Sequence, residues 1–255
     1  MSSLTKPVIA GNWKMHLGPD DARAWADAFT AAYPAGDRTI VVFPPAASLA
    51  VLAWALRDRS DIRLGVQNIH WEPKGAFTGE TSAPIARQAG ASVALIGHSE
   101  RRHVFGETDE EVGRKVRAAL AHDLDAMVCV GETIDERRAG RVDEVILRQL
   151  DAALAALPKD AVERFSIAYE PVWAIGTGET ATPQDASAAH ATLRKRLGEK
   201  LGASVASDIP ILYGGSVKPS NAAELLAAPN VDGLLVGGAS LEAAGFAQIA
   251  RPRSG

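Results

Sequence analysis

Short apolar runs alternate along the chain with longer segments whose apolar residues recur at helical spacing. We predict eight strands, because eight runs are short, rich in β-branched residues and bounded by polar or glycine-containing turns. Several runs are apolar at consecutive positions, which is typical of strands covered on both faces. The predicted strands cover residues 7–11, 40–43, 62–66, 92–96, 126–130, 166–169, 211–213 and 233–236.

One helix is expected after each strand. Thr108 and Glu111 have the spacing of a capping box, and Thr182 before Pro183 has the pattern of an N-cap followed by a proline in the first turn. The predicted helices lie near residues 19–32, 46–56, 82–89, 108–120, 142–157, 182–197, 221–226 and 240–250. Such regular alternation predicts an α/β fold, a single-domain (β/α)8 barrel (TIM barrel) over residues 1–255. The absence of Gly-x-Gly-x-x-Gly after the first strand argues against a doubly wound open sheet.

Composition narrows the possible partners and the compartment. With 255 residues, of which 47% are hydrophobic, the chain can bury a large core. A net charge of −4 without runs of basic residues argues against a nucleic-acid partner. The single Cys129 excludes an intramolecular disulfide, and residues 1–6 lack the apolar core of a signal peptide, so a cytoplasmic location is expected.

A membrane span and a metal centre both lack support. Residues 39–56 carry no charge and reach the roughly 18 residues of a span, but Pro44 and Pro45 divide them into a strand and a helix. The six histidines show no paired ligand spacing, and Cys129 stands alone, so no metal site is expected.

Ionisable side chains follow three of the predicted strands. Lys14 comes after the first strand, His98 after the fourth and Glu170 after the sixth. In a barrel the loops that follow the strands share one face, so these side chains should converge. Each has an ordinary structural explanation, but together they favour a catalytic site. Glu100 could neutralise Lys14, because a buried ammonium needs a partner.

The three groups suit proton transfer beside a carbonyl. Backbone N–H groups at a helix start after His98 would disfavour an imidazolium, so we expect a neutral ring that donates a hydrogen bond. With Glu170 as the base, such a pair could remove a proton α to a carbonyl and stabilise the resulting enediolate. The segment from Pro171 to Gly178 begins with conformationally restricted residues and ends with flexible glycines. This pattern predicts a loop that closes as a lid beside Glu170.

Glycines follow the sixth, seventh and eighth strands, at Gly176, Gly215-Ser216 and Gly237-Gly238. Their backbone N–H groups could approach an anion closely, and barrels commonly bind phosphate after strands seven and eight. Tight turns are the simpler explanation of any one pair. Three such positions in the expected loops predict a phosphate site.

Seven motifs, in order, resemble those of the triosephosphate isomerase family, and the resemblance covers nearly the whole chain. They are Gly11-Asn12-Trp13-Lys14, residues 75–80, residues 97–102, Cys129-Val130-Gly131-Glu132, residues 169–178, residues 213–216 and residues 235–238. The resemblance implies an isomerase of glycolysis and gluconeogenesis that interconverts dihydroxyacetone phosphate and glyceraldehyde 3-phosphate without cofactor or metal.

By motif position, the resemblance implies that Glu170 is the base, His98 the neutral electrophile and Lys14 the cation that binds substrate and stabilises the enediolate, with Glu100 paired to Lys14. Asn12 would hydrogen-bond the substrate. The remaining implied roles are phosphate binding by Gly176, Ser216, Gly237 and Gly238, and closure over Glu170 by Ile175 and Leu235, which would dry the carboxylate and raise its basicity.

The family is dimeric, so the resemblance also implies a homodimer in which the loop around Thr78 reaches into the partner. Two other functions stay open. One is a sugar-phosphate aldolase that uses Lys14 as a Schiff base, and the other is a barrel that binds a phosphorylated metabolite without catalysis.

Overall fold

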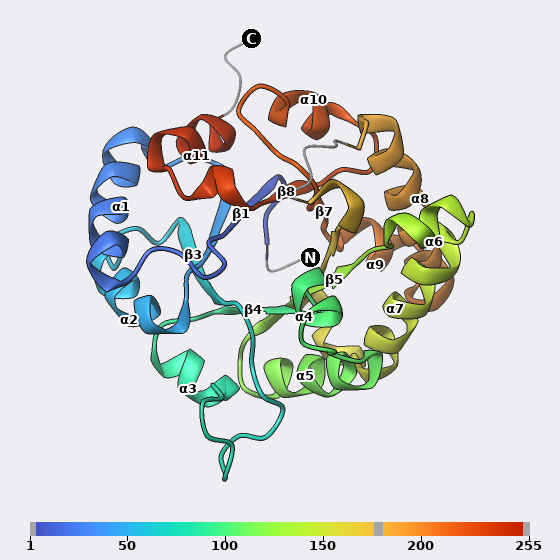
Figure 1. Ribbon diagram of the computed structural model, residues 1–255, viewed down its shortest axis with the longest axis horizontal. Coiled ribbons are helices and arrows are strands. Elements are labelled where there is room, and N and C mark those ends of the chain that lie inside the picture. The colour runs from blue at the N-terminus through green and yellow to red at the C-terminus, as the bar shows by residue number, and fades with distance from the viewer. Residues whose placement is uncertain (1–3, 176–180, 252–255) are drawn as a thin grey trace.

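Eight parallel strands form a closed barrel in chain order, with helices around it (Figure 1). The computed structural model describes residues 4–175 and 181–251. The first strand closes the barrel by pairing with the second and with the eighth. The predicted (β/α)8 barrel is therefore confirmed. The strands are β1 Val8–Asn12, β2 Thr39–Phe43, β3 Ile62–Val66, β4 Val93–Ile96, β5 Asp125–Val130, β6 Phe165–Tyr169, β7 Ile211–Tyr213 and β8 Gly233–Val236.

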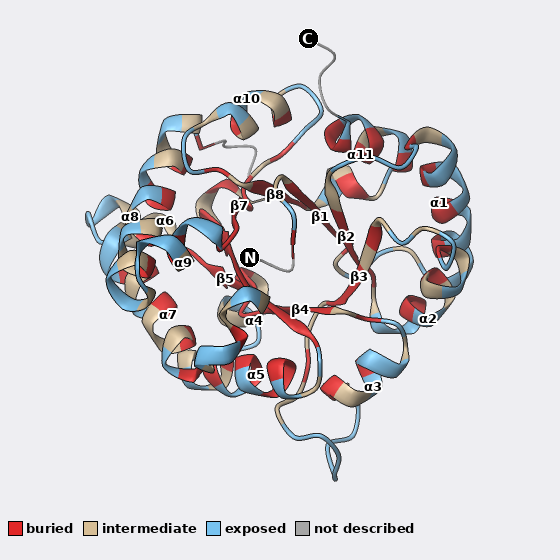
Figure 2. Ribbon diagram, turned by 180° about the vertical axis from the view of Figure 1, so that it is seen from behind, coloured by how far each residue is buried: buried red, intermediate tan, exposed pale blue. Residues whose placement is uncertain are grey.

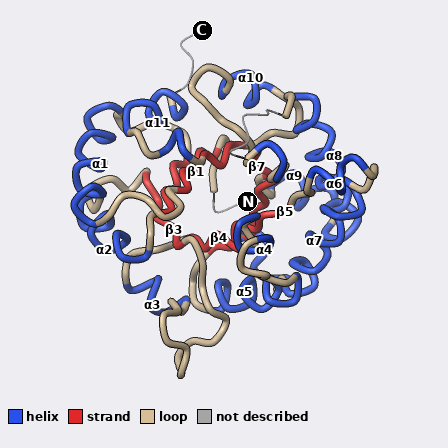
Figure 3. The backbone as a smooth tube through the Cα atoms, viewed as in Figure 1, coloured by secondary structure: helices blue, strands red, loops and turns tan. Residues whose placement is uncertain are grey.

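The helices form an outer layer around the strands (Figure 3). All eight predicted helices are present, and the capping boxes at Thr108 and Thr182 are formed. The last helix begins at Ala243, because Ser240 belongs to a short 3-10 turn instead. The eight are α1 Pro19–Ala32, α2 Ala46–Ala55, α3 Ala83–Gln88, α5 Asp109–Ala121, α7 Val142–Ala156, α8 Pro183–Leu201, α10 Ala222–Ala227 and α11 Ala243–Ala250.

The barrel also contains short helices beyond the eight predicted ones, and of these only a helix start after His98 had been expected. Three further short helices occur, α4 Ser99–His103, α6 Ile134–Arg138 and α9 Ala203–Asp208. Helix α6 has no buried residue and begins with a capping box at Thr133. Helices α4 and α6 each begin with a side-chain cap, whereas α9 begins at Gly202 without one. All three are only five or six residues long, so hydrophobic periodicity does not reveal them.

The strands separate two apolar cores, which explains their continuous apolar sequences. Val8 and Ala10 of β1 belong to the cluster inside the barrel, whereas Ile9 between them packs in the cluster shared with the helices. Figure 2 shows the strands buried and the helices exposed on their outer faces. Gly65 leaves room inside for Phe43, whose ring would lie 2.1 Å from a Cβ at that position.

The uncharged stretch over residues 39–56 forms β2 and α2, as the sequence predicted. Among the described residues, no helix has the length and apolar character needed to cross a membrane.

The connection from β3 to α3 projects away from the barrel (Figure 1). His70 bridges to Ser82 at its base, and Thr78 near its tip is exposed. Phe77 is partly exposed and its ring lies 4.0 Å from that of His70. The loop thus presents an aromatic side chain to solvent beyond the helical layer.

Candidate active site

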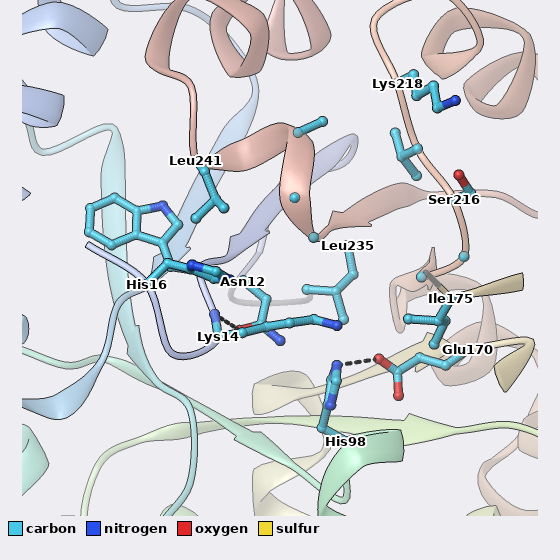
Figure 4. A pocket seen from close by; sticks show the side chains of 17 residues that line it. Asn12, Lys14, His16, His98, Glu170, Ile175, Ser216, Lys218, Leu235 and Leu241 are labelled. Atoms are coloured by element: carbon cyan, nitrogen blue, oxygen red, sulfur yellow. Dashed lines mark hydrogen bonds and ion pairs between the residues drawn. The ribbon is translucent and has the colours of Figure 1, made fainter. Parts of the chain in front are cut away.

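A cavity of about 430 Å³ opens at the carboxyl ends of the strands (Figure 4). Loops after β1, β4, β6, β7 and β8 contribute to it, so side chains far apart in sequence meet as expected. Gly176 lies outside the described residues, and Glu100 lines an adjoining cavity instead. The expected residues that line the main cavity are Asn12, Lys14, His98, Glu170, Ile175, Ser216, Leu235, Gly237 and Gly238.

Two sides of this cavity differ in composition. We call Lys14, His98 and Glu170 the acid–base side, and Gly215, Ser216, Gly237 and Gly238 the glycine side. The side chain of Lys14 extends from the end of β1 into the cavity, between Leu235 and His98 (Figure 4).

Lys14 has a backbone conformation that non-glycine residues seldom adopt, with φ at 52°. Its N–H donates to Asn12 Oδ1 at 3.0 Å, and its carbonyl accepts from Gln67 Nε2 at 2.8 Å. Its Nζ donates to Glu100 Oε1 at 2.5 Å. The backbone and the side chain of Lys14 are thus each held by a neighbouring residue, which fixes its ammonium beside the carboxyl end of β1. Because Asn12 Oδ1 holds the backbone, its amide nitrogen is the atom left to bind a ligand.

His98 is buried and directly precedes helix α4. The N–H of Glu100 donates to His98 Nδ1 at 3.2 Å, so in the neutral ring the proton lies on Nε2. Nε2 faces Glu170 Oε1 at 3.0 Å. The short helix therefore selects the tautomer that presents an N–H donor to the cavity.

Glu170 follows β6 and is only 2% exposed. Its Oε2 accepts a hydrogen bond from the N–H of Ser99 at 2.9 Å, and its Oε1 contacts His98. Glycines make room for it on both sides. A Cβ at Gly131 would lie 1.7 Å from the carbonyl oxygen of Glu170, and one at Gly214 would lie 2.9 Å from its Cγ. The carboxylate is thus enclosed and doubly hydrogen-bonded.

The contact between Glu170 and His98 shifts the pKa of both groups in the free site. Burial raises the pKa of Glu170, but the contacts with His98 and the Ser99 N–H outweigh it and hold that pKa below its ordinary value. Burial lowers the pKa of His98, but the carboxylates of Glu170 and Glu100 raise it by a larger amount. The pKa of His98 therefore lies above its ordinary value.

In this free site the pKa of His98 is therefore raised rather than lowered, contrary to the expectation from the helix start alone. The physical reason is that the Ser99 N–H donates to Glu170, and that the carboxylate then lies directly against the imidazole. Strand-end positions in a sequence do not determine such a contact. The expected rise in Glu170 basicity refers to the carboxylate enclosed by Ile175 and Leu235 with substrate bound, and it stays a prediction.

The segment after Glu170 is supported from behind by a buried carboxylate. Tyr169 donates its hydroxyl to Glu132 Oε2 at 3.0 Å, and Trp173 Nε1 donates to Glu132 Oε1 at 2.9 Å. Ile175 and Leu235 flank Glu170 at the cavity (Figure 4). The lid predicted over Pro171–Gly178 is described only as far as Ile175, and the remainder lies outside the described residues.

The glycine side offers backbone rather than side-chain charge. Gly238 has open space where a Cβ would be, and Gly237 would place one 3.8 Å from Lys14 Cε. A ligand can therefore approach these peptide groups closely, near the ammonium of Lys14. Within residues 4–175 and 181–251, no three His, Cys, Asp or Glu side chains group as a metal site.

Several cavity residues were missed by the sequence analysis. His16 and Lys218 bring polar groups to the cavity, and Leu241 brings an apolar one. His16 lies two residues beyond a recognised motif, and Lys218 two residues beyond another, so extending each motif would have found them.

Comparison with known proteins decides the family. The family model for triosephosphate isomerase matches residues 7–253. A triosephosphate isomerase from Roseiflexus sp. (strain RS-1) is 50% identical over 244 residues, covering 95% of this chain and 96% of its own. One from Herpetosiphon aurantiacus is 48% identical over 249 residues, covering 97% and 99% of the two chains.

The chain belongs to the triosephosphate isomerase family. A further relative, the triosephosphate isomerase of Moorella thermoacetica, is 48% identical over 246 residues, with 96% of this chain and 98% of its own covered. The family resemblance seen in the motifs is thereby confirmed, and with it the assignment of the chain as an isomerase.

Proposed function

We propose that the cavity interconverts dihydroxyacetone phosphate and glyceraldehyde 3-phosphate through an enediolate. The observation that supports this most is the meeting of a buried carboxylate, an imidazole N–H and an ammonium at one cavity, with Glu170 Oε1 3.0 Å from His98 Nε2. These are the three groups that an enolisation needs: a base, a hydrogen-bond donor to the carbonyl and a cation for the developing negative charge.

Glu170 acts as the base. Its pKa is held below the ordinary value in the free site, so the carboxylate is ionised and ready to accept a proton. It removes the proton on the carbon next to the carbonyl, and the C–H electron pair forms the C=C bond as the carbonyl oxygen becomes an oxyanion. The hydroxyl proton of the adjacent oxygen then passes to this oxyanion, which moves the negative charge of the enediolate to the other oxygen. The carboxylic acid returns its proton to the carbon that had carried the carbonyl while the other oxygen becomes the new carbonyl, which completes the aldose–ketose exchange.

His98 and Lys14 stabilise the oxyanion. The Nε2–H of the neutral ring donates to the substrate oxygen once the substrate separates it from Glu170, and the Lys14 ammonium supplies positive charge nearby. Glu100 keeps Lys14 oriented, and Asn12 donates its amide N–H to the substrate.

Ile175 and Leu235 exclude water from Glu170 when substrate is bound. The carboxylate must then leave the Ser99 N–H, and both changes raise its pKa above that of the free site. Ser216, Gly237 and Gly238 bind the phosphate through backbone N–H groups, and Gly176 is proposed to join them.

A phosphate-sugar aldolase is the weaker candidate. A Schiff base requires an uncharged amine, whereas Lys14 forms a close ion pair with Glu100. Borohydride treatment in the presence of dihydroxyacetone phosphate should therefore trap no adduct on Lys14. A binding protein without catalysis would not need a buried base beside an imidazole donor.

The deciding experiment is an assay of the purified protein with glyceraldehyde 3-phosphate in deuterated water containing EDTA. We expect dihydroxyacetone phosphate to form and to carry deuterium at the carbon that receives the proton, because the acid form of Glu170 exchanges with solvent. Binding of substrate without product would support the non-catalytic barrel, and cleavage or condensation products would support the aldolase.

We further propose a cytoplasmic homodimer. The cavity beside Glu100 is bordered by Met15, which is 93% exposed, and by Phe105, which is 67% exposed. The loop that carries Phe77 and Thr78 projects from the same molecule. Burial of these apolar groups against a second copy would remove them from water, with the loop of one copy seated beside Lys14 of the other.

Sedimentation of a Thr78→Arg variant tests this dimer. We expect it to sediment as a monomer, because a charged side chain would be forced into a buried contact, while Ser204→Arg on exposed helix α9 keeps the mass of the native protein. A Thr78→Arg variant with unchanged mass would contradict the proposed interface.

A further inference from the structure

The turn between β7 and α10 builds one wall of the glycine side. Gly214, Gly215, Ser216, Val217 and Lys218 all line the cavity. Asn221 closes this turn directly before helix α10, and it does not itself line the cavity. A residue outside the cavity wall therefore borders the turn on the side away from a bound substrate.

Asn221 uses its side chain in an unusual direction. Asparagine directly before a helix commonly accepts a hydrogen bond from the first turn of that helix, but here no such bond to α10 is made. Instead Asn221 Oδ1 accepts from the N–H of Lys218 at 2.8 Å, and Nδ2 donates to the carbonyl of Ser216 at 3.1 Å. Both polar atoms of the amide therefore hold the preceding turn.

The first of these two bonds has a structural explanation. The N–H of Ala222 donates to the carbonyl of Lys218 at 3.0 Å, so Asn221 Oδ1 completes a compact turn that leads into the helix. The second bond lies outside that turn, because Ser216 precedes it. A carbonyl oxygen carries partial negative charge, and holding it on an amide N–H keeps it from facing a bound anion.

The bond also fixes the orientation of the peptide group that follows Ser216. In a trans peptide the C=O and the next N–H point in opposite directions, so a carbonyl held on Asn221 sends the N–H of Val217 the other way. The loop after β8 shows the same arrangement. There Ser240 Oγ donates to the carbonyl of Gly237 at 2.7 Å, from the last residue of the 3-10 turn that follows β8.

We propose that Asn221 is a positioning residue for the substrate phosphate, because its Nδ2 turns the Ser216 carbonyl away from the anion site. This inference rests on the proposed function, since it takes the anion to be the phosphate of a triose phosphate. Asn221 acts on binding rather than on proton transfer, because the acid–base side lies on other loops.

Two substitutions separate positioning from turn stability. Asn221→Asp keeps an oxygen for the Lys218 N–H but cannot donate to Ser216, whereas Asn221→Ala loses both bonds. Ser220→Asp is the matched control, because it adds the same charge at an exposed neighbouring position without touching Ser216. For each variant, KM and kcat with glyceraldehyde 3-phosphate are measured, together with the dissociation constant of inorganic phosphate by calorimetry and the Tm.

We expect Asn221→Asp to raise KM and the phosphate dissociation constant about 3- to 10-fold above those of Ser220→Asp, as for loss of one hydrogen bond. Its kcat should stay within about twofold and its Tm near that of the control. Equal phosphate binding in the two Asp variants would overturn the proposal, even if Asn221→Ala melts early. Calorimetry needs no turnover, so an inactive native protein with weakened phosphate binding in Asn221→Asp would refute the proposed function alone.

Discussion

The acid–base side of the cavity is built from side chains, whereas the glycine side is built from backbone. On the acid–base side, Lys14, His98 and Glu170 each place an ionisable side chain in the cavity and hold it with a second group. On the glycine side, Gly237 and Gly238 offer backbone, and the side chain of Lys14 from the acid–base side lies close to Gly237.

This difference separates two tasks. A side chain can change its protonation state, so it suits a proton that must leave one carbon and arrive at another. A peptide N–H keeps its partial charge at every pH and does not move far, so it suits a group that stays bound throughout. Changes on the first side should therefore affect kcat, and changes on the second should affect KM.

Replacing Glu170 by Gln should give the largest effect. The amide has the same shape and its oxygen still accepts from the Ser99 N–H, but it cannot take a proton. We expect kcat to fall by about 10³-fold and KM to change little, as measured in the coupled isomerase assay. A melting curve like that of the native protein serves as the control. Retained turnover would remove the distinction between the two sides.

Replacing Gly215 by Ala should act mainly on binding. A Cβ there would lie 2.1 Å from the hydroxyl oxygen of Tyr213, so the turn carrying Ser216 must shift. We expect KM to rise roughly tenfold, and overpacking should cost about 1–3 kcal/mol of unfolding free energy in a urea titration.

Gly198→Ala on helix α8 is the matched control for this change, because its Cβ meets no atom within 4 Å. It should leave KM unchanged and stabilise the helix slightly. If Gly215→Ala instead lowered kcat at constant KM, the glycine side would take part in proton transfer.

The smallest effect on turnover is expected at His190, which sharpens the comparison because it is buried and, among the described residues, its ring forms no hydrogen bond to a carboxylate. Burial lowers its pKa to about 4, whereas Glu170 and Glu100 raise that of His98. The unfolded chain binds a proton near pH 6.5, so stability from His190 is complete above that pH and is lost as pH falls toward 4. The loss amounts to about 3 kcal/mol.

Urea unfolding of the native protein and of a His190→Gln variant between pH 7 and 4 measures this. Glutamine can still donate to the carbonyl of Asn230, which His190 Nδ1 contacts at 2.9 Å. We expect the pH dependence over this interval to be weaker in the variant, with kcat at pH 7 within about twofold of native. Parallel curves would show that burial alone does not suppress protonation of His190.

The barrel could be predicted from the sequence because its signals are local. Apolar runs as in β5, and a capping box such as that at Thr108, specify their elements without reference to distant residues. The meeting of Lys14, His98 and Glu170 also followed, because parallel strands deliver their carboxyl ends to one face. What mattered there was position along a strand.

Contacts between atoms of different loops could not be predicted in this way. The directions of the His98 and Glu170 pKa shifts depend on the 3.0 Å contact between His98 Nε2 and Glu170 Oε1. They depend also on the hydrogen bond that Glu170 accepts from the Ser99 N–H. The sequence motif ended at Ser216, so it gave no reason to connect Asn221 with the turn between β7 and α10. Such links depend on turn geometry, which residue type alone leaves open.

The backbone of Lys14 has a consequence for engineering. A lysine with φ at 52° costs roughly 1–2 kcal/mol relative to an ordinary conformation, and glycine at the same position would escape most of that cost. A search that selects variants by melting temperature alone would therefore favour replacement of this residue. Such a search would select stable variants of this protein that lack the Lys14 ammonium. Variants selected for thermal stability should therefore be screened for turnover at the same time.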